Sequence, residues 1–146
     1  MIEILHGMDL TQWALKRIPV VQKFGPNVCI GVGDGKNVIA AAIYYDYDGY
    51  NMQMAFAADT PRAITRKVIR ELLSYPFHIA GVARLTNFVE ATNAKSIRIT
   101  EGVGFKREGL IRRGYRNGSD MIVYGLLPED CEQWIGKVVH RSEMAA

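Results

Sequence analysis

The sequence predicts an α/β (α+β) fold in one domain, residues 1–146, with a mixed sheet of about seven strands. Three observations support this class. Strand-like apolar runs separated by polar bends fill residues 28–58. Beyond them, segments with helical periodicity alternate with strand-like runs. The 146 residues are 49% hydrophobic and 23% charged, which is ordinary for a soluble domain large enough to bury one core.

The first strand is expected at residues 2–5, and a helix follows it. Asp9 or Thr11 has the side-chain oxygen that can cap a helix start, and Pro19 ends or bends the helix. The apolar residues at helical spacing are expected to face inward, and they are Leu10, Trp13, Ala14, Ile18 and Val21.

Three antiparallel strands are expected next. Residues 28–32 and 38–45 flank the step Asp34-Gly35, which is a strong hairpin signal. A second polar bend at residues 46–50 leads into a third strand at residues 51–58.

A longer helix is predicted to start at Thr60, because Thr60 can cap it and Pro61 suits its first turn. Pro76 is expected to close it. Its buried face is formed by Ile64, Val68, Ile69, Leu72 and Leu73. The opposite face carries an i, i+4 stripe of arginines, Arg62, Arg66 and Arg70.

The remaining elements are a strand, a short helix, a hairpin and a last helix. The strand is expected within residues 80–89, and the short helix follows Asn93. The hairpin pairs residues 105–115 with residues 120–127. Pro128 starts a final amphipathic helix, whose apolar side is formed by Cys131, Trp134, Ile135, Val138 and Val139.

The short helix has polar residues on its apolar side. Thr92 or Asn93 can cap its start, and Gly104 ends it. At about 100° per residue, Asn93, Ser96 and Thr100 fall inside the apolar arc. Burying such groups without partners costs about 1–3 kcal/mol each, so each needs a hydrogen-bond partner. Either a neighbouring strand or ordered water supplies the partners, or a ligand does.

Around this helix the chain resembles the GNAT superfamily of N-acetyltransferases. The branch it resembles most is that of the ribosomal-protein N-terminal acetyltransferases and small phage-borne relatives. The resemblance spans about residues 51–131. The matching residues are Asn93-x-x-Ser96, Gly104-Phe105-x-x-Glu108-Gly109, Arg112 and Asp120-Met121-x-Val123-Tyr124-x-Leu126.

This resemblance implies a fold in which the fourth and fifth strands splay apart and acetyl-CoA enters the V between them. The implied activity is acetyl-CoA-dependent transfer of an acetyl group to a primary amine, on a peptide or protein N-terminus or on a small molecule. The residues expected to bind the cofactor are Phe56, Ala57, Ala58, Arg62, Thr65, Arg66, Asn93 and Ser96. Ser96 and Thr100 are the catalytic candidates.

The chain departs from the family pattern in two places. The phosphate loop of relatives, Gln/Arg-x-x-Gly-x-Gly/Ala, aligns with a segment in which Thr65 and Lys67 replace both glycines. We therefore expect the side chains of Arg62 and Arg66 to bind the phosphates of coenzyme A. Thr100 stands where many relatives carry a proton-donating tyrosine, so we expect catalysis by positioning and electrostatics.

The proton acceptor for the amine is left open. The predicted strand at residues 51–58 contains no carboxylate, whereas Asp46, Asp48 or Glu90 could act through water. A backbone N–H near Phe56 is expected to stabilise the oxyanion.

The charge distribution supports an alternative from another class. The net charge is +3, but residues 106–116 contain five basic residues and one acid, while the rest of the chain contains 13 basic and 14 acidic residues. Such a local patch suits an anionic partner. The alternative is therefore a non-catalytic module that binds acyl-CoA or nucleic acid, or contacts the ribosome, through Lys106–Arg116, with Tyr115 stacking on a base.

The sequence also leads to expectations about the compartment, metal binding and assembly of the protein. Cys29 and Cys131 are far apart and the three histidines lack ligand spacing, so neither a disulfide nor a metal site is expected. No apolar run is long enough to cross a membrane, and the first residues do not resemble a signal peptide, so we expect a cytoplasmic protein. The assembly is left open, with a homodimer as one option.

Overall fold

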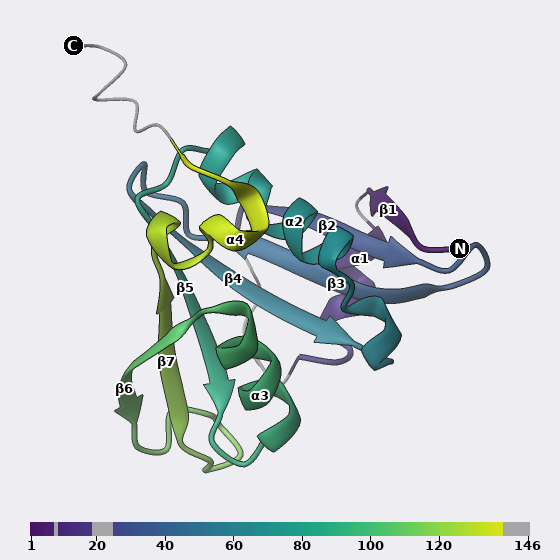
Figure 1. Cartoon of the computed structure of the whole chain (residues 1–146). Helices are drawn as coiled ribbons and strands as arrows, with labels where there is room; N and C mark the ends of the chain where they lie inside the picture. The colour runs from purple at the N-terminus through teal and green to yellow at the C-terminus, as the bar shows by residue number, and fades with distance from the viewer. Residues whose placement is uncertain (8, 19–24, 139–146) are drawn as a thin grey trace.

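A seven-stranded mixed sheet forms the centre of the computed structural model, which describes residues 1–7, 9–18 and 25–138 (Figure 1). The strands are β1 (Glu3–His6), β2 (Asn27–Gly33), β3 (Val38–Tyr45), β4 (Asn51–Ala58), β5 (Arg84–Glu90), β6 (Lys106–Ile111) and β7 (Met121–Leu126). Their order in the sheet is β1-β2-β3-β4-β5-β7-β6. Among the strands of the described residues, only β4 and β5 pair in parallel. The predicted α/β class with a mixed sheet is confirmed.

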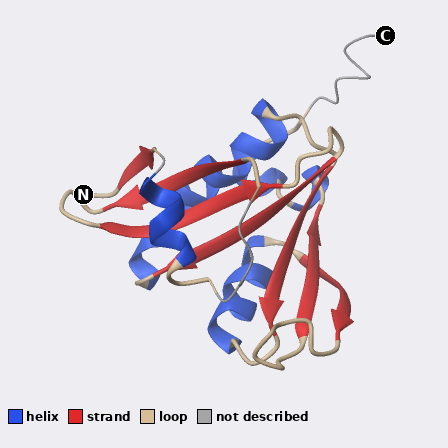
Figure 2. Cartoon of the chain, turned by 180° about the vertical axis from the view of Figure 1, so that it is seen from behind, coloured by secondary structure: helices blue, strands red, loops and turns tan. Residues whose placement is uncertain are grey.

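Helices cover both faces of the sheet. Helix α1 (Asp9–Leu15) packs over β2 and β3 on one face, where its Leu10 and Ala14 meet buried Ile43 (Figure 2). Helices α2 (Arg66–Ser74), α3 (Ala94–Val103) and α4 (Glu132–Ile135) lie on the other face, over the larger core (Figures 1 and 2). The contacts of α1 are mainly with β3 and β2, at the β2–β3 side of this face.

β4 and β5 separate before either strand ends. They pair from Asn51 with Arg84 to Met54 with Asn87, yet β4 continues to Ala58 and β5 to Glu90. Figures 1 and 2 show the two strands diverging from this point, with α3 beside the opening. The splay implied by the resemblance is therefore present, and its apex lies at the pair Met54 and Asn87.

The helix expected from Thr60 begins later than predicted, at Arg66. Thr60 instead caps a separate 3-10 turn, Pro61–Ala63, by accepting a hydrogen bond from the N–H of Arg62 at 3.4 Å. The chain then leaves helical geometry at Ile64, where φ is −94° and ψ is 75°.

The true cap of α2 is Thr65. Its Oγ1 accepts a hydrogen bond from the N–H of Val68 at 3.2 Å. Arg62 lies outside α2, so the predicted stripe of three arginines on one helix is wrong, and only Arg66 and Arg70 remain on α2.

Pro76 does not close the helix, contrary to the prediction. The chain continues from α2 into a π-helical turn, Tyr75–Ile79, that contains Pro76. A proline has no N–H for the carbonyl four residues earlier, which is that of Leu72. The buried hydroxyl of Tyr44 donates to this carbonyl oxygen at 2.6 Å. The partner from β3 thus replaces the hydrogen bond that Pro76 cannot make, and the helical path continues.

The C-terminal half follows the prediction with shorter elements. Asn93 caps α3, and Gly104 ends it with φ 127°. β6 ends at Ile111, so the predicted hairpin has a longer loop. The final helix is reduced to a 3-10 turn, Pro128–Asp130, and α4, because Gly136 ends α4 with φ 74°.

Three predicted positions, Pro19, Val21 and Val139, lie outside the described residues. Among the described helices, none combines the length and apolar character needed to cross a membrane. Cys29 and Cys131 are buried thiols, and burial raises their pKa to about 11 and about 12.

Candidate active site

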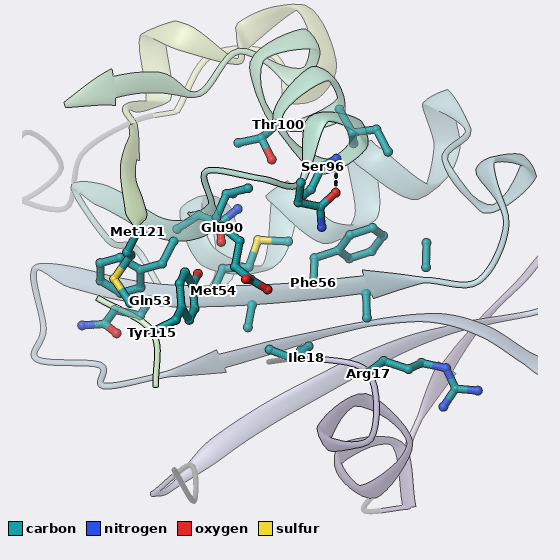
Figure 3. A pocket seen from close by; sticks show the side chains of 18 of the residues that line it. Arg17, Ile18, Gln53, Met54, Phe56, Glu90, Ser96, Thr100, Tyr115 and Met121 are labelled. Atoms are coloured by element: carbon teal, nitrogen blue, oxygen red, sulfur yellow. Dashed lines mark hydrogen bonds between the residues drawn. The ribbon is translucent and has the colours of Figure 1, made fainter. Parts of the chain in front are cut away.

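A cavity of about 550 Å³ occupies the opening between β4 and β5 (Figure 3). It is lined by the second half of β4, the end of β5, the start of α3, the end of β3 and the segments around Arg17 and Tyr115. Because it is lined from both sheet faces, a donor and an acceptor can approach the diverging strands from opposite sides.

Six of the predicted site residues meet in this cavity. Phe56, Ala57 and Ala58 line it from β4, and Asn93, Ser96 and Thr100 line it from α3. In Figure 3, Ser96 and Thr100 project from α3 toward the strand that carries Phe56.

The edge of β4 that faces the cavity is open. Residues 55–58 pair with β3 on one side, but they have no partner on β5. Backbone N–H and C=O groups on an open strand edge need partners, and an extended amide-bearing ligand supplies them.

Two nearly buried polar side chains have no hydrogen-bond partner among the described residues. Asn87 is 8% exposed and Thr100 is 6% exposed, and both line the cavity at the apex of the V. Neither side chain makes a hydrogen bond within the described part of the chain, although both retain contact with the cavity. For Thr100, the interpretation that a neighbouring strand satisfies the hydroxyl therefore fails. The open position suits a ligand.

Asn93 combines a structural role with its place in the cavity. Its Oδ1 accepts a hydrogen bond from the N–H of Ser96 at 3.0 Å, which caps α3. The hydroxyl of Ser96 has no partner among the described residues. The protein itself therefore provides a partner for the side chain of Asn93, whereas the hydroxyl of Ser96 is left to water or a ligand.

The three residues predicted to hold the phosphates lie beside the cavity rather than in its lining. Thr60 and Pro61 line the rim, whereas Arg62, Thr65 and Arg66 do not. These three occupy the segment that enters α2, where free backbone N–H groups favour an anion.

Both arginines of this segment have partners in the structure. Arg62, 65% exposed, pairs with Asp34 at 2.9 Å, and Arg66 stacks over the ring of Trp134 at 5.0 Å from the ring centroid. The backbone N–H groups of Lys36 and Asn37 hold the pKa of Asp34 below its usual value.

Glu90 supplies negative charge to the cavity, which it lines from the end of β5. Its Oε2 accepts hydrogen bonds from Asn117 Nδ2 at 3.0 Å and from Ser119 Oγ at 2.6 Å. These two bonds lower the pKa of Glu90 from its ordinary value of 4.5. The carboxylate is therefore ionised at neutral pH and is held by neutral donors.

Two tyrosines and a second carboxylate stand near Glu90. Tyr115 is 7% exposed, and burial followed by the charge of Glu90 and the proximity of Tyr45 raises its pKa to about 12. Burial and Asp46 raise the pKa of Tyr45 to about 12 as well. Figure 3 shows Tyr115, Met121 and Gln53 together at this end of the cavity. Both phenols stay protonated at neutral pH, so neither is a base.

The three carboxylates that the sequence offers as proton acceptors do not all lie at the cavity. Glu90 and Asp46 line the cavity, whereas Asp48 does not. Asp48 Oδ1 accepts hydrogen bonds from the N–H groups of Tyr50 and Asn51, at 2.9 and 2.7 Å, and so closes the bend before β4.

The basic segment Lys106–Arg116 is partly neutralised. Lys106 pairs with Asp130 at 3.1 Å, and Arg107 pairs with Glu101 at 3.1 Å. Tyr115 is buried in the cavity wall and does not present its ring for stacking on a base. The described contacts therefore give no support to a nucleic-acid interface at this hairpin.

Sequence reasoning missed Asn87 and the segment around Arg17. Asn87 shares a strand face with Leu85 and Val89. A polar residue at a core position of the predicted strand was therefore the signal that could have identified Asn87 as a site residue. Arg17 binds Asp59 through two nitrogens, at 2.7 and 3.0 Å, and ties the end of α1 to the end of β4. No local pattern indicates that pair. Within the described residues, no group of three or more histidine, cysteine or acidic side chains is placed to hold a metal ion.

Several solved structures of acetyltransferases are similar to this chain. No protein-family model matches the chain, and no curated protein matches it. Among solved structures, a spermidine/spermine N-acetyltransferase from Vibrio cholerae is similar, with 13% identity, 87% of this chain and 95% of that chain covered, and a TM-score of 0.72.

Two further structures are similar over a shorter length. The ribosomal-protein-S5-alanine acetyltransferase from Vibrio fischeri has 18% identity and a TM-score of 0.62, with 74% of this chain and 63% of that chain covered. A structure described as a "Probable acetyltransferase" has 22% identity and a TM-score of 0.63, with 70% of this chain and 63% of that chain covered. The chain thus spans less than two thirds of each of these two proteins. It has the fold of the GNAT acetyltransferases.

Proposed function

We propose that this protein transfers an acetyl group from acetyl-CoA to a primary amine. The observation that carries the proposal is the open edge of β4 at residues 55–58, which faces a cavity of about 550 Å³ with unpartnered Asn87 and Thr100 at its apex. An extended thioester with amides along its arm matches both features.

The donor is expected to lie along β4, with its phosphates at the start of α2. Arg62 and Arg66 are close to that helix start, and exposed Lys95 adds a cation on the α3 side of the cavity. Without the loop glycines of the family pattern, side chains take a larger share of the phosphate binding. The thioester is then expected near the apex, within reach of Thr100 and Asn87.

The acceptor amine is expected to enter from the side of Glu90. An ionised carboxylate attracts an ammonium group, and the ring of half-buried Tyr45, which also lines the cavity, is aromatic surface of the kind that binds cations. Glu90 is a weak base, because its pKa lies below 4.5 while amines have values of about 8–10. Its role is therefore to hold the acceptor and pass the proton to water.

The transfer step uses these groups in sequence. The amine nitrogen donates its lone pair to the thioester carbonyl carbon, and its proton leaves through water near Glu90. The carbon–nitrogen bond forms, and the carbon–sulfur bond breaks with its electron pair on sulfur. A backbone N–H near Phe56 is expected to stabilise the oxyanion. The thiolate leaves without a strong acid, and the hydroxyls of Thr100 and Ser96 are suited to hydrogen-bond it.

The experiment is an acetyl-transfer assay with a panel of acceptors. The protein is incubated with acetyl-CoA and with spermidine, an alanine-terminated peptide or a lysine peptide, and the product mass and the released thiol are measured. We expect one amine class to gain 42 mass units, about the mass of one added acetyl group less a proton, with equal thiol release. The control is Glu90→Gln, for which the acceptor KM should rise by about tenfold. Thiol release that does not depend on any amine would contradict the transfer.

A further inference from the structure

A second, smaller cavity adjoins the apex of the V. Its volume is about 50 Å³, and it lies between α2, α3 and the sheet. It shares five lining residues with the large cavity, namely Met54, Phe56, Asn87, Ile99 and Thr100. The two spaces therefore meet where β4 and β5 stop pairing.

The small cavity is apolar beyond this junction. Its remaining walls are aliphatic or aromatic, from α2 and its approach and from the end of α3, and they include Ile69, Leu72 and Val103. Asn87 and Thr100 are the polar side chains in its lining, and both stand at the junction. An apolar space of this kind does not offer a water the two to four partners that it needs.

The volume suits a short aliphatic group. A cavity must have about 10–15 Å³ to hold one water-sized group, so this one has room for roughly three. Thr100 is small enough to leave the passage open, and a bulky side chain at the same position would block it.

We infer that the small cavity receives the part of the donor's acyl chain that extends beyond two carbons. The protein then accepts propionyl- and butyryl-CoA in addition to acetyl-CoA. This inference rests on the proposed function, because it requires the thioester to lie at the apex beside Thr100. The bonds made and broken are those of acetyl transfer, and the added carbons do not react.

The contact that is expected to favour propionyl- and butyryl-CoA over acetyl-CoA is apolar. Each methylene that leaves water for an apolar pocket strengthens binding by about fourfold. Butyryl-CoA, with two more methylenes than acetyl-CoA, should therefore bind about fifteenfold more tightly. A longer chain such as octanoyl exceeds the volume and should lose this advantage.

The test is titration calorimetry of the full chain with free CoA and with acetyl-, propionyl-, butyryl- and octanoyl-CoA. Binding requires no acceptor, so the result does not depend on knowing one. We expect the dissociation constant to fall from acetyl to butyryl and to rise again for octanoyl. Equal constants for acetyl- and butyryl-CoA would overturn the inference while leaving acetyl transfer intact. No binding of any thioester would overturn both.

Two variants with opposite effects on the volume of the small cavity test whether the acyl chain lies in it. Val103 and Ile69 line the small cavity and not the large one. Val103→Leu fills space, so it should abolish the butyryl advantage while leaving the acetyl-CoA constant unchanged. Ile69→Ala adds space, so it should extend the advantage to octanoyl-CoA. If both variants shift all thioesters and free CoA equally, the cavity contacts the pantetheine arm instead, and the inference is wrong.

Discussion

Met54 on β4 and Asn87 on β5 are the last parallel pair before the two strands separate. Asn87 is 8% exposed there and has no hydrogen-bond partner among the described residues. Its polar atoms keep contact with the cavity, so replacing Asn87 with an apolar group of similar size removes no hydrogen bond within the described part of the protein. The pair marks where a ligand should meet the protein.

Asn87→Leu and Thr100→Val should therefore leave the free protein as stable as the wild type, within about 0.5 kcal/mol. Both should reduce the stabilisation that acetyl-CoA provides. The measurement is thermal unfolding with and without acetyl-CoA. Tyr44→Phe is the control, because loss of its hydrogen bond to the Leu72 carbonyl should cost about 1–3 kcal/mol in both conditions. Equal losses for all three variants in both conditions would assign Asn87 and Thr100 to the core.

Glu90 should control the acid limb of the activity profile. Its two hydrogen bonds lower its pKa, so the carboxylate remains ionised as the pH falls below 4.5. Ser119→Ala removes one donor and should move the fall of acceptor kcat/KM to higher pH. Glu90→Gln should remove this limb. An acid limb that is the same in wild type and both variants would exclude Glu90 from acceptor binding.

The same pKa shift has a consequence for folding. Because the pKa is lower in the folded protein than in the unfolded chain, the hydrogen bonds to Glu90 stabilise the fold above pH 4.5. This contribution is lost as the pH falls through the folded-state value.

Much of the fold follows from local patterns, and the exceptions have identifiable causes. The capping of α3 by Asn93 and its end at Gly104 are local, so the sequence predicts them. The start of α2 is ambiguous locally, since Thr60 and Thr65 both carry a capping oxygen, and only the backbone at Ile64 decides between them.

Other features depend on residues far away in the sequence. At the π-helical turn that contains Pro76, the carbonyl of Leu72 accepts its hydrogen bond from Tyr44 on β3. The role of Glu90 depends on donors 27 and 29 residues away, Asn117 and Ser119, which the loop between β6 and β7 brings to it. Strand patterns predicted β4 and β5, and only the resemblance implied that they separate.

Tyr44→Phe tests the explanation of the π-helical turn. The variant leaves the buried carbonyl of Leu72 without the donor at 2.6 Å, so it should destabilise the fold by about 1–3 kcal/mol. Tyr75→Phe is the matched control, because Tyr75 contacts Tyr44 edge to face, whereas the donor to that carbonyl is Tyr44. Urea unfolding of both variants gives the comparison. Equal stability of Tyr44→Phe and wild type would refute the explanation.

Arg62 and Arg66 should matter only for ligands that carry phosphates. Changing both to alanine should weaken coenzyme A by about tenfold or more, and leave dephosphorylated pantetheine unaffected. Arg70→Ala is the control, since Arg70 bonds the carbonyl of Trp134 and lies beyond the start of α2. Calorimetric titration of the wild type, the double variant and Arg70→Ala with each ligand gives the dissociation constants. Equal weakening of both ligands would point to damage of the fold instead.

The central claim is that the cavity between β4 and β5 binds an acyl-CoA, and thermal unfolding of the wild type with acetyl-CoA tests it most directly. A ligand at about a hundredfold excess over its dissociation constant stabilises the folded state by about 2.7 kcal/mol. For a chain of 146 residues this corresponds to a rise in Tm of roughly 5–10 °C. We predict that rise with acetyl-CoA and none with an equal concentration of adenine. An unchanged Tm at millimolar acetyl-CoA would contradict the account.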